Sequence, residues 1–115
     1  MSPLDVSNPW FVNSDQEWAA WLAAHGSTAT DFVIAIYKKS SGRQTVGFET
    51  LLETALAHGW VDTQTKSIDD DSYAIRWVRR RPGSNWSERN RAIAKKLIEE
   101  GRMTPAGHAV LPPDL

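Results

Sequence analysis

One stretch of the chain, between residues 48 and 59, carries the most regular helical repeat. Its apolar residues follow one another at spacings of one, three and four positions: Phe48, Leu51, Leu52, Ala55 and Leu56. That spacing gathers them on one side of an α-helix, and Gly59 is suited to end the helix because glycine readily adopts the left-handed conformation. A helix with one apolar side has to bury it against another layer, which the rest of the chain must supply.

That second layer is predicted to be a β-sheet. Residues 32–37 are all apolar or aromatic, which is typical of a central strand covered on both faces. Residues 60–68 and 73–79 are two further β-like runs, joined by an acidic segment, residues 69–72, whose side chains favour a turn. We therefore expect a hairpin in which Ile68 faces Tyr73 and, counting back, Asp62 faces Arg79.

Two more helices are expected along the chain, one before the first of these strands and one after the last. Ser14 followed by Glu17 is a capping-box pattern, and the helix that it starts carries its apolar stripe at Trp18, Trp21 and Leu22 before a left-handed stop at Gly26. We expect Trp21 and Leu52 at the centres of their stripes. After Pro82 and Gly83, either Ser84 or Ser87 can cap a third helix, whose stripe is Ile93, Ala94, Leu97 and Ile98 and whose end is Gly101. Thr104 and Pro105 then predict a last short turn.

The predicted fold is a single α+β domain spanning residues 1–115. It has a small, mainly antiparallel sheet of about three strands packed with three helices, in the order α-β-α-β-β-α. Six tryptophans provide bulk for the core, and the absence of cysteine excludes disulfides, thiolate zinc sites and cysteine nucleophiles. Neither an export signal nor an apolar run long enough for a membrane span occurs, so we expect a cytoplasmic protein without membrane insertion.

Charge is unevenly distributed along the chain. Residues 1–75 hold four Lys and Arg against ten Asp and Glu, whereas residues 76–102 hold nine against three. One reading is a nucleic-acid surface at residues 76–102, where basic residues alternate with Trp77 and Trp86. The other is a pair of oppositely charged faces that pair with each other, which the net charge of −1 favours.

The candidate binding site lies where the second hairpin strand leads into the third helix. Arg79, Arg80 and Arg81 precede a turn at Pro82 and Gly83 and the start of that helix. Guanidinium groups beside a helix N-terminus are what an anion site needs. The candidate ligand-binding residues are therefore Trp60, Asp62, Arg80, Ser84, Trp86, Ser87 and Asn90. The alternative is structural: serine caps, a core Trp86, and an ion pair of Asp62 with Arg79 or a neighbouring Arg80 that holds the hairpin in register.

Metal and catalytic patterns are weak. The three histidines, His25, His58 and His108, lack helical ligand spacing, and residues 69–71 lack the alternating ligands of a calcium loop. We expect neither metal nor cofactor. Neither His58 with Asp62 nor Ser84 or Ser87 has the surroundings of a known catalytic motif, so we assign no catalytic residue, although a small-substrate enzyme stays an alternative.

Four blocks of sequence occur in a recognisable order. They are Glu17–Leu22, Leu51–Asp62, Arg80–Asn90 and Gly101–Gly107. Together they resemble the bacterial YdeI/OmpD-associated, or bacteriocin-protection, family over residues 10–111, with departures at His58 and Arg79. The resemblance implies protection against antimicrobial peptides and association with an outer-membrane porin, but the chain lacks the export signal that a periplasmic location would need. We therefore expect a non-enzymatic binding or stress-protection module whose partner is a small anion or a protein.

Overall fold

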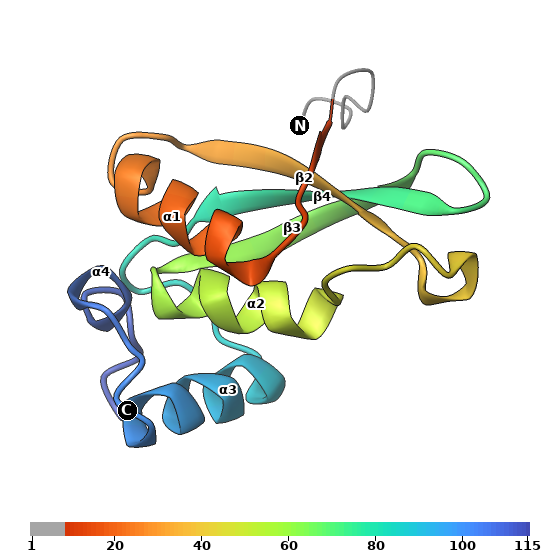
Figure 1. The fold of residues 1–115 in the computed structure, drawn as a ribbon. Helices are drawn as coiled ribbons and strands as arrows, with labels where there is room; N and C mark the ends of the chain where they lie inside the picture. Colours follow the sequence, from red (N-terminus) through yellow and green to blue (C-terminus); the bar gives the residue numbers. More distant parts are fainter. Residues whose placement is uncertain (1–8) are drawn as a thin grey trace.

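In the computed structural model, which describes residues 9–115, four strands form one sheet (Figure 1). The strands are β1 (Trp10–Phe11), β2 (Asp31–Tyr37), β3 (Trp60–Ser67) and β4 (Ser72–Arg79). Their order across the sheet is β1-β2-β4-β3, with β1 parallel to β2 and the other neighbours antiparallel. The α+β class and the mainly antiparallel sheet are confirmed. The sheet has one strand more than expected, because β1 is only two residues long and too short to show a pattern.

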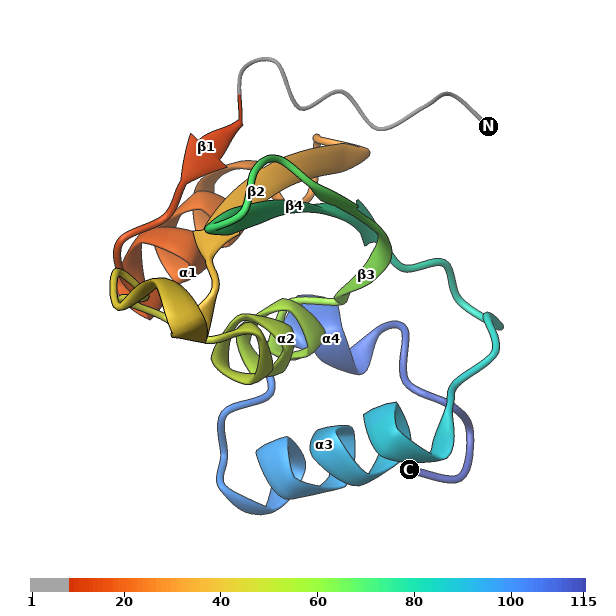
Figure 2. The same ribbon diagram turned by 90° about the vertical axis from the view of Figure 1, so that its right-hand side faces the viewer.

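The helices of the described part lie on one face of the sheet, in two layers (Figure 2). Helices α1 (Asp15–His25) and α2 (Phe48–Ala57) lie under the sheet, and α3 (Glu88–Glu99) packs on the far side of α2. The expected last turn is a short helix, α4 (Pro105–His108), and a 3-10 helix, η1 (Lys39–Ser41), follows β2. The three predicted helices are therefore all present, and the first element within residues 9–115 is a strand rather than a helix.

Side-chain caps mark where α1, α3 and α4 begin. The hydroxyl of Ser14 accepts a hydrogen bond of 3.2 Å from the Glu17 N–H, as the capping box predicts. The Glu17 carboxylate, however, accepts from the N–H of Asn13 rather than of Ser14. At α3 the cap is Ser87, whose hydroxyl accepts from the Asn90 N–H at 3.1 Å, which leaves Ser84 available for another role.

Gly26 ends α1 for a reason other than the expected one. Its φ is −64°, so the predicted left-handed conformation is wrong. A Cβ at this position would lie 2.4 Å from the Leu22 carbonyl oxygen and 3.3 Å from Trp60 Nε1. The position therefore needs glycine for lack of space, whereas Gly59, after α2, has the left-handed φ of 80° that the sequence predicts.

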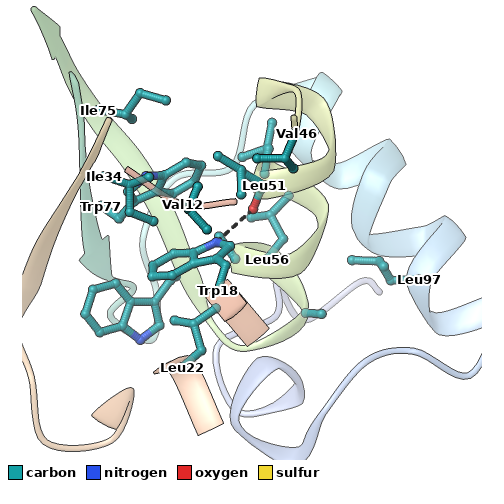
Figure 3. Close-up of a cluster of buried hydrophobic side chains, with 14 of the residues drawn as sticks. Val12, Trp18, Leu22, Ile34, Val46, Leu51, Leu56, Ile75, Trp77 and Leu97 are labelled. Atoms are coloured by element: carbon teal, nitrogen blue, oxygen red, sulfur yellow. Dashed lines mark hydrogen bonds between the residues drawn. The ribbon is translucent and has the colours of Figure 1, made fainter. Parts of the chain in front are cut away.

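The core between the sheet and the first helical layer is built around tryptophan (Figure 3). Trp18, Trp60 and Trp77 are fully buried, and the Trp18 indole donates a hydrogen bond of 3.1 Å to the Leu51 carbonyl on α2. Trp21, expected at the centre of its stripe, is only half-buried. Three successive residues of β2, from Ile34 to Ile36, are buried, although the helices of the described part cover only one face of the sheet.

The register of the β3–β4 hairpin differs from the predicted one. Ser67 rather than Ile68 faces Tyr73, and Asp62 faces Trp77 rather than Arg79. The predicted opposition of Asp62 and Arg79 is therefore wrong. Two local features cause the shift. The connection between the paired residues Ser67 and Tyr73 has five residues, not the expected four. In addition, a β-bulge at Thr63 inserts one more residue into β3.

Candidate functional site

A pocket of about 450 Å³ lies where β3, the end of β4 and the start of α3 meet. Five of the seven predicted site residues line it: Asp62, Arg80, Ser84, Ser87 and Asn90. We call it the Arg80 pocket. The structure thus brings together most of the residues that the sequence singled out, although the hairpin register by which they were related was wrong.

Arg80 has an unusually buried side chain for an arginine. Its backbone N–H donates 2.7 Å to the Gly59 carbonyl, and the residue is only 8% exposed. The guanidinium Cζ lies 3.8 Å from the centroid of the Trp86 ring, and Nη2 donates to the Asn85 carbonyl at 2.5 Å. Stacking and this one hydrogen bond fix the plane of the guanidinium at the wall of the pocket.

Two nitrogens of that guanidinium are left without an acceptor. Nε and Nη1 of Arg80 are buried and have no hydrogen-bond partner among the described residues, and the same holds for the hydroxyl of Ser84. Burial lowers the pKa of Arg80, and the charge of Asp62 opposes that effect. An arginine remains protonated nonetheless, so a residue that lines the pocket carries a positive charge and donors without acceptors.

The first turn of α3 adds to this positive character. Ser87 is the N-cap of the 12-residue helix, and both Ser87 and Asn90 line the pocket. The N-terminal end of a helix carries a partial positive charge and unsatisfied N–H groups. The helix start and the arginine therefore favour negative charge in the same pocket.

Asp62 brings an opposite charge to this pocket. It immediately precedes the bulge at Thr63, and bulges redirect side chains relative to a regular strand. The ion pairs of the described residues do not include Asp62, although its charge acts on Arg80. Asp62 therefore acts on Arg80 through its charge without forming an ion pair with it.

The two predicted tryptophans have different positions. Trp60 is fully buried and its indole donates a hydrogen bond of 3.1 Å to the Gly26 carbonyl, so the structure places it in the core and outside the pocket wall. Trp86 lies against the guanidinium of Arg80 and positions it. Alternation along the strand puts Trp60 on the same face as Asp62, but only the packing of α1 could reveal that Trp60 is covered.

A second hollow, of about 770 Å³, adjoins the first across the end of β4. The two share residues 78–81, and the second is also lined by Arg76 and Asp31, which form an ion pair at 3.0 Å. This hollow was not predicted from the sequence. The sequence feature that could have indicated it is the run of three arginines at residues 79–81, because successive residues at the end of a strand point to opposite faces of the sheet.

Most of the basic segment is paired with acidic side chains. Four ion pairs join residues 76–102 to the acidic first part of the chain: Arg76 with Asp31, Arg89 with Glu49, and both Lys96 and Arg102 with Glu53. Trp77, which the nucleic-acid reading needed at the surface, is fully buried. Both observations favour the reading of two faces that pair with each other.

Groups suited to other chemistry are sparse in the described part. His58 caps α2 and its Nδ1 lies 3.0 Å from the Thr54 carbonyl, outside the lining of the pocket. Among residues 9–115, three or more potential metal-ligating side chains do not come together anywhere. The helices of this part are all too short or too polar to cross a membrane.

Comparison with known proteins gives a family without an assigned role. No curated protein and no solved structure matches the chain. The resemblance to the YdeI/OmpD-associated family therefore stays a prediction. A family model described as a domain of unknown function, DUF8412, matches residues 10–110, and the chain therefore belongs to that family.

Proposed function

We propose that the protein is a non-enzymatic binding module that holds a small anionic ligand in the Arg80 pocket. One observation carries the proposal: Arg80 is only 8% exposed, and two nitrogens of its guanidinium are buried without an acceptor. Burying a charged donor without a partner is costly, and an anionic ligand would offset that cost with charge-assisted hydrogen bonds. The hydroxyl of Ser84 and the start of α3 would add further donors.

The lining of the pocket also supports reversible binding rather than catalysis. The hydroxyl of Ser87 is used as a helix cap, and His58 lies elsewhere, so the serines that line the pocket have no histidine beside them. Activation of a serine needs such an adjacent base. The protective role that the YdeI/OmpD-associated resemblance implies stays a prediction, and binding an anion is compatible with it.

The experiment is a thermal denaturation series in phosphate or sulfate, compared with chloride at matched ionic strength. A ligand at about 100 times its dissociation constant stabilises the folded state by about 2.7 kcal/mol, which raises the melting temperature by several degrees in a domain of this size. Sulfate also stabilises proteins generally by exclusion from their surfaces, so the comparison between variants decides the outcome.

Arg80→Ala is a poor test variant, because removing a buried side chain that stacks on Trp86 also weakens the fold. Ser84→Ala is better, since it removes a buried hydroxyl that has no partner and should leave the anion-free protein as stable as before. Arg80→Lys keeps the charge but loses the planar donor arrangement. Lys95→Ala, on the exposed side of α3, removes a positive charge outside the pocket and is the control for general electrostatic effects of the added anion.

We expect the anion-specific gain in the wild type and in Lys95→Ala, and a much smaller gain in Ser84→Ala and Arg80→Lys. The same gain in all four proteins would overturn the proposal, because Arg80 and Ser84 would then have only a structural role.

A further inference from the structure

Asp62 is an unexpected residue for a pocket that selects negative charge. It lines the Arg80 pocket together with Arg80 and Ser84. It acts on Arg80 through its charge, yet no ion pair joins the two side chains. The pocket therefore presents a cation and an anion that do not neutralise each other by contact.

Such an arrangement discriminates among anions. A ligand that carries only negative charge is attracted by Arg80 but repelled by Asp62. A ligand with an additional positive group facing Asp62 loses that repulsion and gains a charge-assisted hydrogen bond. Specificity of this kind depends on the unfavourable contact with the wrong ligand as much as on the favourable one with the right ligand.

The residue that Asp62 faces across the hairpin depends on the bulge in β3. Asp62 faces Trp77 across the hairpin, whereas Gln64, on the other side of Thr63, faces Arg76. The inserted residue thus separates the part of β3 that lines the Arg80 pocket from the part that leads to the hairpin turn. Bulges often occur beside binding sites, where they redirect a side chain.

We propose that the ligand of the Arg80 pocket is a small zwitterion, with a carboxylate or phosphate for Arg80 and Ser84 and an ammonium group for Asp62. This inference rests on the proposed function and adds the chemical class of the ligand. A volume of about 450 Å³ is within the range of small-molecule sites.

The test uses two pairs of probes that match in length and differ in one group. β-Alanine is compared with butyrate, and 2-aminoethyl phosphate with n-propyl phosphate, so that each pair exchanges an ammonium for a methyl group. The two pairs also distinguish a carboxylate from a phosphate as the anionic group. Binding is followed by NMR titration of the backbone amides of Asp62, Ser84 and Asn90, which measures weak affinities directly.

For the wild type we expect the ammonium member of at least one pair to bind about tenfold more tightly than its methyl partner. Asp62→Asn should reduce that ratio to about twofold or less, and it should strengthen the binding of the methyl member because the repulsion is gone. Asp70→Asn, at the exposed hairpin turn, removes the same charge elsewhere and should leave the ratio unchanged.

The results separate the two proposals. Equal affinities within both pairs in the wild type, or equal weakening of both members by Asp62→Asn, would overturn the inference, because Asp62 would then serve only as a counter-charge for Arg80. The proposed function would survive that result if phosphate or sulfate still stabilised the wild type through Ser84 and Arg80. If the wild type bound none of these anions, both the inference and the proposed function would be overturned.

Discussion

The carbonyl of Ala57, at the end of α2, accepts two hydrogen bonds from Thr104, one from its backbone N–H at 3.0 Å and one from its hydroxyl at 2.7 Å. The same hydroxyl accepts from the Gly107 N–H and thereby caps α4. Gly107 itself lies against this carbonyl, where a Cβ would come within 2.4 Å of the oxygen. One threonine therefore joins the C-terminal segment to the core.

Thr104→Val keeps the shape of the side chain and removes both hydroxyl interactions. We expect it to lower the free energy of unfolding by about 1 to 3 kcal/mol, because a carbonyl and an N–H lose a partner in a part-buried position. Urea denaturation measures the change. Thr28→Val is the control, since the Thr28 hydroxyl donates one exposed bond to His25, and an equal loss in both variants would contradict the role of Thr104.

Core substitutions should follow burial rather than position in the sequence pattern. Leu52→Ala is expected to cost about 2 to 5 kcal/mol and Trp18→Ala about 3 to 5 kcal/mol, because both side chains are almost completely buried. Trp21→Ala should cost less than Trp18→Ala, since Trp21 is half-buried and stacks on Phe32 at the edge of the core. Denaturant midpoints give the ranking, and a larger loss at Trp21 would contradict this account of the packing.

The corrected hairpin register changes which pair should be coupled. A double-mutant cycle of Asp62→Asn with Arg80→Gln should return an interaction free energy of about 0.5 kcal/mol or more, because the charge of Asp62 acts on Arg80. The cycle with Arg79→Gln should give a smaller value, since Arg79 faces Trp60 and its side chain donates to the Ser27 carbonyl. Stronger coupling to Arg79 would mean that the register in solution differs.

The hairpin turn predicts a dependence of stability on acid. The backbone N–H of Asp71 and the hydroxyl of Ser72 donate to the Asp69 carboxylate and hold its pKa below the ordinary value of an aspartate. A carboxyl whose pKa is lower in the folded state contributes stability above pH about 4, and this stability is lost as the pH falls through the folded-state pKa.

Asp69→Asn should therefore be less stable than the wild type at pH 6, with a difference that shrinks below pH about 4. The effect is small because Asp69 is exposed. Urea midpoints across this range test it, with Asp70→Asn as the neighbouring control. A difference that stays constant with pH would rule out the carboxylate charge as its cause.

Nucleic-acid binding through residues 76–102 should be weak. Five of the nine basic residues of this segment are in ion pairs, and Trp77 is buried, which leaves few cations and no stacking platform at that position. A gel-shift titration with single-stranded and double-stranded DNA and RNA should show no shift at physiological salt. A shift that weakens steeply with salt would instead favour the nucleic-acid reading.

Local signals in the sequence were enough to predict the helices. The caps at Ser14 and Thr104 and the apolar spacing of residues 48–56 act within a few residues, so they can be recognised without knowledge of the fold. The register of the β3–β4 hairpin could not be predicted, because it depends on the turn length and on the bulge at Thr63, and no local pattern indicates either of them.

The candidate site was predictable to the extent that its residues lie close together in the chain. Arg80, Ser84, Ser87 and Asn90 span one turn and the start of one helix, and they do line a common pocket. The burial of Trp60 depends on contacts with α1, more than 30 residues away, as its hydrogen bond to Gly26 illustrates. The missing acceptors of Arg80 could be recognised only from the packed structure.

The bulge at Thr63 has a consequence for solubility as well. Strand β3 is the last strand of the sheet, and a regular outer strand presents a row of unpaired backbone groups to which a strand of another molecule can add. The extra residue interrupts that row, and the exposed charge of Lys66 further along disfavours an approaching strand. The irregularity beside Asp62 thus also makes this edge a poor template for intermolecular β-sheet growth.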